Sequence, residues 1–282
     1  MRAVLIVFSL WIPILCASWT AADTNTDRFL IDFRDAQSIE QHRPILAAHR
    51  GGVVTEKSSE CSLTAIRLAA KLGYDLVEVD VQRSRDGVPI VFHDNTLDKA
   101  CGREESVSEL NATDLEQIHY LKGDDKIARL ETALTICRDL KIGVMLDLKA
   151  GRESRDFLES IDALIVRFKL ENASISFSGS DQARMHLKHV RFTPTDDEMR
   201  RLRAGESIDL SNRFWFGLPS RLLDDDITKL HKARALIIPA INTFRYPADK
   251  HKELARRDVE RLTKAGVHGF QIDSVYFDLF TK

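Results

Sequence analysis

The apolar residues of this chain gather in short β-type runs that alternate with longer stretches of helical periodicity. Strands are predicted at 45–48, 76–81, 88–92, 143–149, 173–178, 213–218, 235–241 and 269–273, with a weaker candidate at 190–192. Helices are predicted at 62–72, 106–119, 130–140, 154–170, 196–204 and 251–265. Strands that alternate with helices favour a parallel sheet, and at this length we expect a single-domain (β/α)8 TIM barrel of the α/β class.

The N-terminal residues follow a different pattern. One cation, Arg2, precedes an apolar run at 3–15, and small residues follow at 20–22. This order is typical of a secretory signal peptide, and the run is shorter than the roughly 20 residues of a membrane span. We therefore expect a signal peptide at 1–22, with an uncleaved anchor as the alternative. An irregular lead-in at 23–44 and the barrel at 45–282 would follow, in a periplasmic or secreted protein.

Composition and charge exclude several classes of protein. The 282 residues are 44% hydrophobic and 30% charged, which excludes a disordered chain or a small disulfide scaffold. The formal net charge of −2 provides no basic field for nucleic acid. We expect no nucleic-acid partner and no stable membrane span, and the sequence leaves the oligomeric state open.

Three cysteines remain after the expected signal peptide, and export would permit disulfides. Cys61 and Cys101 lie in loops expected on the same face of the barrel, so we predict that they form a disulfide. Cys137 fits the apolar rhythm of the 130–140 helix, which favours a buried thiol.

The predicted strand ends carry residues suited to one chemistry. His49 and Arg50 follow the first strand, Glu78 and Asp80 alternate in the second, His93 and Asp94 follow the third, and Asp147 and Lys149 alternate in the fourth. Catalytic groups of TIM barrels gather at the carboxyl ends of strands, and residues two apart in a strand share a face.

Three converging carboxylates favour one hard divalent cation, Mg²⁺ or Ca²⁺. Arg50 and Lys149 could hold a phosphate group, while a histidine pair could act as acid and base. Each pair by itself could be an ordinary ion pair or turn. Together they indicate metal-assisted phosphodiester cleavage.

These residues lie in segments that resemble glycerophosphodiester phosphodiesterases. The segments are AHRGG (48–52), the run from SECSLTAI to DKACG (59–102), ARLETAL (128–134) and VMLDLK (144–149), with a weaker similarity in KAGVHGFQIDS (264–274). The resemblance implies a TIM barrel that hydrolyses glycerophosphodiesters or lysophospholipid-type substrates to glycerol phosphate and an alcohol.

The resemblance also implies a role for each matching residue. His49 and His93 would be the acid and base, Glu78, Asp80 and Asp147 the metal ligands, Arg50 and Lys149 the phosphate-binding groups, and Glu60 a supporting acid.

Three departures from the family pattern point to a non-standard substrate. The family's usual Pro-Glu-Asn-Thr is Ser-Glu-Cys-Ser at 59–62, its usual third metal ligand is Glu where Asp147 stands, and its tryptophan-rich strand is replaced at 239–244. Aspartate at the third position resembles the sphingomyelinase D relatives. The alternatives are therefore a sphingomyelinase D-like or phosphatidylinositol phospholipase C-like lyase that ends at a cyclic phosphate, or a catalytically silent phosphodiester-binding barrel. An isomerase or aldolase is disfavoured because no Schiff-base lysine is suggested.

Overall fold

The computed structural model describes residues 29–149 and 153–281. The expected signal peptide at 1–22 lies outside the described residues. Among the helices of the described ranges, none is long and apolar enough to cross a bilayer.

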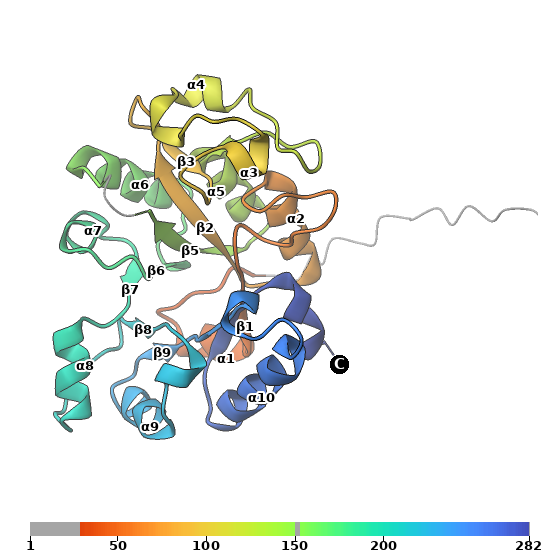
Figure 1. Cartoon of the computed structure of the whole chain (residues 1–282). Coiled ribbons are helices and arrows are strands. Elements are labelled where there is room, and N and C mark those ends of the chain that lie inside the picture. The colour runs from red at the N-terminus through yellow and green to blue at the C-terminus, as the bar shows by residue number, and fades with distance from the viewer. Residues whose placement is uncertain (1–28, 150–152, 282) are drawn as a thin grey trace, which may run out of the picture.

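Parallel strands follow one another around a barrel, with helices outside them (Figure 1). The strands that form the barrel wall, called staves below, are β1 (Ile45–Ala48), β2 (Leu76–Arg83), β5 (Gly143–Leu148), β6 (Ser174–Ser176), β7 (Arg191–Phe192), β8 (Phe214–Trp215), β9 (Leu236–Ile237) continued by β10 (Ala240–Ile241), and β11 (Gly269–Ile272). Parallel pairings run from β1 through β2, β5 and β6 to β7. On the other side β8 pairs with β9, and β10, the continuation of β9, pairs with β11, which pairs with β1. A single parallel bridge between Phe192 and Arg213 joins β7 to β8. The TIM barrel predicted from the sequence is confirmed.

The helices cover the outside of the strands, with α2, α5 and α6 on one side of Figure 1 and α8, α9 and α10 on the other. Their bounds are α1 (Ala36–Gln41), α2 (Leu63–Leu72), α5 (Leu130–Asp139), α6 (Arg155–Arg167), α7 (Asp181–His186), α8 (Asp196–Arg203), α9 (Asp224–Lys232) and α10 (His251–Lys264). Helix α2 illustrates the local cause. The Ser62 hydroxyl caps its first turn by accepting from the Ala65 N–H, and Gly73 ends it in the left-handed conformation.

Two strand assignments differ from the sequence prediction. The 88–92 segment is not a stave, because the tight turn at Gly87 folds β3 (Pro89–Val91) antiparallel onto β2. Strand β3 also pairs with β4 (Ala128–Arg129). The weak candidate at 190–192 takes the vacant place in the barrel as β7. Hydrophobic pattern alone does not tell these two roles apart, since both segments are short.

The predicted 106–119 helix is wrong in extent. This region forms the 3₁₀ turn η1 (Val107–Glu109) and the short helix α4 (Ala112–Leu115), separated by the extended Leu110. The Asp86 carboxylate accepts from the Ala112 N–H, which fixes the start of α4 beside the β2–β3 turn. With α3 (Asp98–Cys101), these elements enclose a small apolar cluster separate from the main core.

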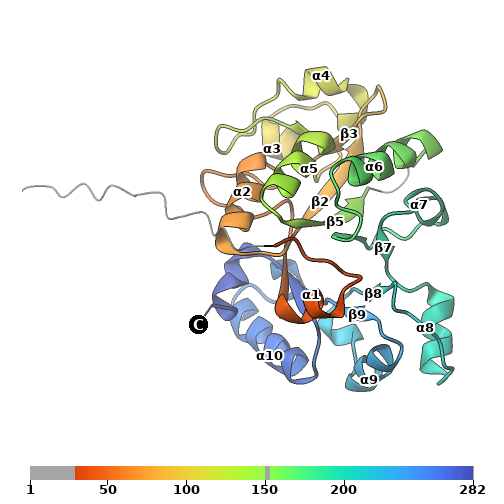
Figure 2. The same ribbon diagram turned by 180° about the vertical axis from the view of Figure 1, so that it is seen from behind.

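The lead-in expected to be irregular is part of the fold where it is described. Ile31 and Phe33 are buried against Ile45, Met145 and Phe214, at the amino-terminal end of the barrel. Helix α1 follows, and Figure 2 shows this segment in red, crossing the strands. Side chains of the lead-in therefore pack against the amino end of the barrel, and the opposite end carries the predicted catalytic residues.

Candidate active site

The first stave ends in a loop that a side chain at either of its glycines would disrupt. A Cβ at Gly51 would lie 2.5 Å from the Cys61 Cα, and one at Gly52 would lie 2.2 Å from the Ala65 carbonyl oxygen. Both glycines have positive φ angles. The loop therefore packs directly on the segment that enters α2, and His49 and Arg50 are held at the barrel mouth.

Three carboxylates meet at the centre of this end. Glu78 and Asp80 project from one face of β2, and the β2–β5 register places Asp80 beside Asp147. Carboxylate oxygens of the three residues lie within 4.8 Å of one another. The ammonium of Lys149 lies 2.5 Å from Asp80 Oδ1 and 2.6 Å from Asp147 Oδ2.

The charge balance of this cluster favours an additional cation. Burial and the neighbouring charges of Asp80 and Asp147 raise the pKa of Glu78 well above its usual value. Burial also opposes ionisation of Asp80, but Lys149 and His93 bring its pKa below the ordinary value. The Lys149 ammonium is one positive charge among three carboxyl groups. An all-oxygen set of this kind fits a hard divalent cation, which Glu78, Asp80 and Asp147 could hold.

His49 is oriented by the last stave. Its Nδ1 lies 2.5 Å from Asp273 Oδ1, and Asp273 Oδ2 accepts from the N–H and the hydroxyl of Thr243. Burial raises the pKa of Asp273, but the bonds from His49 and Thr243 outweigh it and leave that pKa below the ordinary value. An ionised carboxylate on Nδ1 leaves Nε2 of His49 available for proton transfer.

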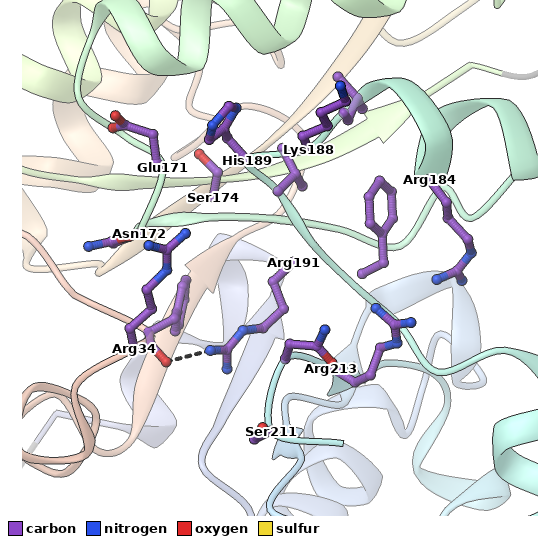
Figure 3. Close-up of a pocket in the computed structure, with 15 residues that line it drawn as sticks. Arg34, Glu171, Asn172, Ser174, Arg184, Lys188, His189, Arg191, Ser211 and Arg213 are labelled. Carbon is purple, nitrogen blue, oxygen red and sulfur yellow. Dashed lines mark hydrogen bonds between the residues drawn. The ribbon is translucent and has the colours of Figure 1, made fainter. Parts of the chain in front are cut away.

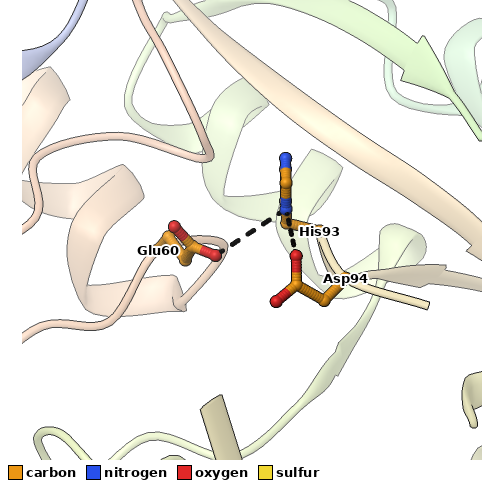
Figure 4. Close-up of side chains that lie close together, drawn as sticks. All are labelled: Glu60, His93 and Asp94. Carbon is orange, nitrogen blue, oxygen red and sulfur yellow. Dashed lines mark hydrogen bonds and ion pairs between the residues drawn. The ribbon is translucent and has the colours of Figure 1, made fainter. Parts of the chain in front are cut away.

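His93 has a similar arrangement (Figure 4). Its Nδ1 lies 2.7 Å from Asp94 Oδ1 and 3.9 Å from Glu60 Oε1, and the other ring nitrogen points away from both carboxylates. Glu60 also accepts from the Arg50 guanidinium at 2.8 Å. The Nε of Arg50 is buried and has no hydrogen-bond partner among the described residues, so this donor is unsatisfied in the structure.

A cavity of about 340 Å³ opens beside these groups, and His49, Arg50, His93 and Asp147 contribute to its wall. The remaining wall is largely apolar and comes from the barrel staves and the loops that follow them: Phe177, Phe216, Gly217, Leu218, Ala240 and Phe244. The Phe177 and Phe216 rings stack with centroids 4.5 Å apart. Arg221 and Arg245 also line the cavity.

The predicted Cys61–Cys101 disulfide is wrong. Both residues are free, buried thiols, and they belong to different apolar clusters. Cys61 Sγ instead donates to Asp80 Oδ2 at 3.2 Å, and burial holds the pKa of this thiol well above its usual value. Cys137 is a buried free thiol, as predicted.

The structure brings the eight residues singled out in the sequence to one end of the barrel. Lys149 contacts carboxylates, so its role in phosphate binding remains a prediction. Sequence reasoning missed the role of Asp273, which holds His49, and of Ser178, whose hydroxyl donates to Asp147 Oδ1 at 3.1 Å. The position of Asp273 directly after the last stave was the available signal, since barrel strand ends carry functional groups.

Comparisons with known proteins agree with this geometry. A model of the glycerophosphoryl diester phosphodiesterase family matches residues 49–275. Glycerophosphodiester phosphodiesterase 1 of Mus musculus is 36% identical over 110 residues, which are 36% of this chain and 33% of that protein. The glycerophosphodiester phosphodiesterase of Caldanaerobacter subterraneus subsp. tengcongensis is 30% identical over 115 residues, or 39% of this chain and 46% of that one. The matched regions thus span about a third to a half of these relatives.

Solved structures show the same fold across most of the chain. A glycerophosphodiester phosphodiesterase from Agrobacterium tumefaciens has a TM-score of 0.63 at 21% identity, covering 84% of this chain and 99% of that one. An Oleispira antarctica phosphodiesterase, solved with the product sn-glycerol-3-phosphate, has a TM-score of 0.62 at 16% identity, covering 86% and 98%. With the family match over residues 49–275, these results show that the chain belongs to the glycerophosphoryl diester phosphodiesterase family.

Proposed function

We propose that this protein hydrolyses a glycerophosphodiester to glycerol phosphate and an alcohol. The observation that carries the proposal is a pair of histidines, each with a carboxylate on Nδ1, on one cavity beside three clustered carboxylates. Binding alone would need no such pair of proton-transfer groups, so the arrangement disfavours a silent barrel. Family membership and the product bound to the Oleispira antarctica relative support the same reaction.

The histidines would divide the proton transfers between them. One imidazole accepts the proton of the attacking oxygen through Nε2, and the other donates a proton to the oxygen of the departing alcohol as the P–O bond breaks. Asp273 holds the ring of His49, and Asp94 with Glu60 holds that of His93. The Arg50 guanidinium, which lines the cavity, would donate to a phosphoryl oxygen.

The carboxylate cluster would hold one divalent cation, which we propose to be Mg²⁺ or Ca²⁺. Glu78, Asp80 and Asp147 supply oxygen ligands, and a cation there would stabilise negative charge on the phosphoryl group. The shorter side chain of Asp147 and its bond from Ser178 set the reach of the third ligand.

The wall of the cavity indicates the class of alcohol. Phe177, Phe216, Leu218 and Phe244 would pack against an apolar substituent, such as the acyl chain of a lysophospholipid. We also propose that the protein acts outside the cytoplasm, because residues 1–22 have the sequence pattern of an export signal.

The decisive experiment is a substrate panel with and without chelator, applied to the wild type, His49→Ala and His93→Ala. We expect each variant to lower kcat by about 100-fold or more, whereas His119→Ala, at an exposed histidine away from the site, should match the wild type. Activity that survives both substitutions would refute the mechanism. Phosphorus NMR of the product would show a phosphomonoester for hydrolysis and a cyclic phosphate for the lyase reaction.

A further inference from the structure

A second and larger cavity, of about 530 Å³, is lined by residues at the amino ends of β6, β7 and β8. Figure 3 shows these residues. The cavity is bordered by the start of β6, by β7, and by the segment before β8, where one bridge joins β7 to β8. The lead-in at Phe33 and Arg34 forms another part of its wall. No residue lines both this cavity and the one beside His49.

Cationic side chains converge on this cavity in two groups (Figure 3). Arg34 and Arg191 lie on one side of the view, and Arg184 and Arg213 lie on the other. Lys188 adds another cation to the wall. The volume falls in the range of small-molecule sites, roughly 300–1,000 Å³.

Arg191 is a charged group in a poorly compensated position. Its guanidinium donates to the Phe33 carbonyl at 2.5 Å and lies over the Phe33 ring, 5.7 Å from the centroid. Burial and the positive charge of Arg34 lower the pKa of Arg191 to about 10, although Asp32 acts in the opposite direction. A carbonyl and an aromatic face do not neutralise a guanidinium, so an anion here would be strongly favoured.

Arg184 is in a similar position. It donates to the carbonyl oxygens of Gly179 and Thr193, at 3.1 and 2.9 Å. Burial and then the charge of Arg213 lower the pKa of Arg184, in spite of Glu198 and Asp181.

The residues that line the cavity include fewer carboxylates than cations. Among the described residues that line the cavity, Glu171 is the acidic one. Arg213 is paired with Glu198, and His189 with Asp162. Within the described ranges, no ion pair joins a carboxylate to Arg34, Arg184, Lys188 or Arg191. Partly buried arginines are ordinarily paired with carboxylates, and among the described residues Arg184 and Arg191 have no such ion pair, whereas Arg34 and Lys188 are exposed.

We propose that this cavity binds a small phosphate-bearing anion, inorganic phosphate or a phosphomonoester, between the Arg34–Arg191 and Arg184–Arg213 groups. Guanidinium groups match the oxygens of a phosphate in bidentate geometry. The side chain of Asn212 and the hydroxyl of Ser211 would supply neutral polar contacts. The site is separate from the reaction centre and does not depend on the proposed hydrolysis.

The test is calorimetric titration of the full-length protein with inorganic phosphate and, in a second arm, with sn-glycerol 3-phosphate. Arg50→Gln, which weakens phosphate binding at the other end of the barrel, should retain this site. In that background, Arg191→Gln and Arg34→Gln should each weaken binding by about tenfold or more. Arg256→Gln, an exposed arginine on α10, is the matched control and should bind as the parent does. The arm with the tighter binding shows whether the site prefers the inorganic anion or a phosphomonoester.

Two results would overturn the proposal. One is phosphate binding that is unchanged in both the Arg191→Gln and the Arg34→Gln variants. The other is equal weakening by Arg256→Gln, which would mean that net charge and not a site is responsible. Arg34 is exposed, so its substitution tests the site even if Arg191→Gln fails to fold.

Discussion

The two ends of the barrel carry opposite charge excesses. At the carboxyl ends of the strands, Glu78, Asp80 and Asp147 cluster around a single ammonium, that of Lys149. At the amino ends, Arg191 and its neighbours line a cavity in whose described wall Glu171 is the acidic residue.

The difference shows what each end requires. A buried cluster of like charge is stable only when an ion of the opposite sign joins it or when its pKa values shift. The acidic end is suited to a metal cation that then attracts a phosphodiester, and the basic end is suited to an anion directly. The near-neutral net charge of −2 conceals both excesses.

The largest effect is expected at the acidic end from Glu78→Gln. Removing one of three oxygen ligands should lower kcat by about 100-fold or more and abolish the increase in Tm on adding Mg²⁺ or Ca²⁺. In metal-free protein the amide relieves carboxylate repulsion, so the Tm should not fall. Glu260→Gln, at an exposed position of α10, is the control. A Glu78→Gln variant with a full metal response would show that the cluster is not the metal site.

Asp273→Asn should also reduce kcat, by about 10- to 100-fold, since the amide no longer holds His49 in one tautomer. Asp278→Asn, nearby but exposed, should behave as the wild type.

The lowered pKa of Asp273 also has a consequence for stability. Its ionised form stabilises the fold above the unfolded pKa of about 3.9, and that contribution disappears as the pH falls through the lower folded value. The stability difference between wild type and Asp273→Asn should therefore shrink below about pH 4, as urea unfolding would show.

At the basic end, His268 predicts a different pH response. Burial, then Arg43, His231 and Arg191, lower its pKa from 6.5 to about 4, and its Nδ1 accepts from the Ile237 N–H. The neutral form is therefore favoured in the folded state. Its stabilisation is complete above pH 6.5 and is lost as the pH falls toward 4.

Urea unfolding between pH 7 and pH 4 tests this response. The wild type should lose about 1–3 kcal/mol more unfolding free energy than His268→Gln, which keeps an acceptor but does not titrate. His119→Gln should follow the wild type. If the unfolding free energies of the wild type and of His268→Gln changed in parallel with pH, the folded protein would not oppose protonation of His268.

The smallest effect concerns the thiols. Since Cys61 and Cys101 are free, a reducing agent should change kcat by less than about twofold. Cys61→Ser keeps a donor to Asp80 and should be nearly silent, while Cys61→Ala should show a somewhat larger loss because Asp80 loses that bond. Loss of activity on reduction would restore the disulfide prediction.

The predictable part of the site lies on β2 and β5. Residues two apart in a strand share a face, so the sequence alone could assign Glu78 and Asp80 to one face of their strand, and Asp147 and Lys149 to one face of theirs. The role of Asp273 was not predictable in the same way, because His49 lies 224 residues away in the sequence. The sequence assigned the 88–92 segment to the barrel, where the structure has β7 instead. The cause is similar, since short strand segments do not specify their pairing partner.

The sequence by itself determined the barrel class, the strands that carry the chemistry, and the groups available for acid–base catalysis and metal binding. These follow from local periodicity and from side-chain chemistry, which neighbouring residues encode. Tertiary structure alone decided that the cysteines stay apart, that Asp273 orients His49, and that arginines of the lead-in and of β7 face one cavity. Phe33 and Arg191 are 158 residues apart, and only closure of the barrel brings their surroundings together. The excess of one sign of charge at each end likewise depends on which charged side chains the fold buries together, and the order of residues in the sequence does not specify this.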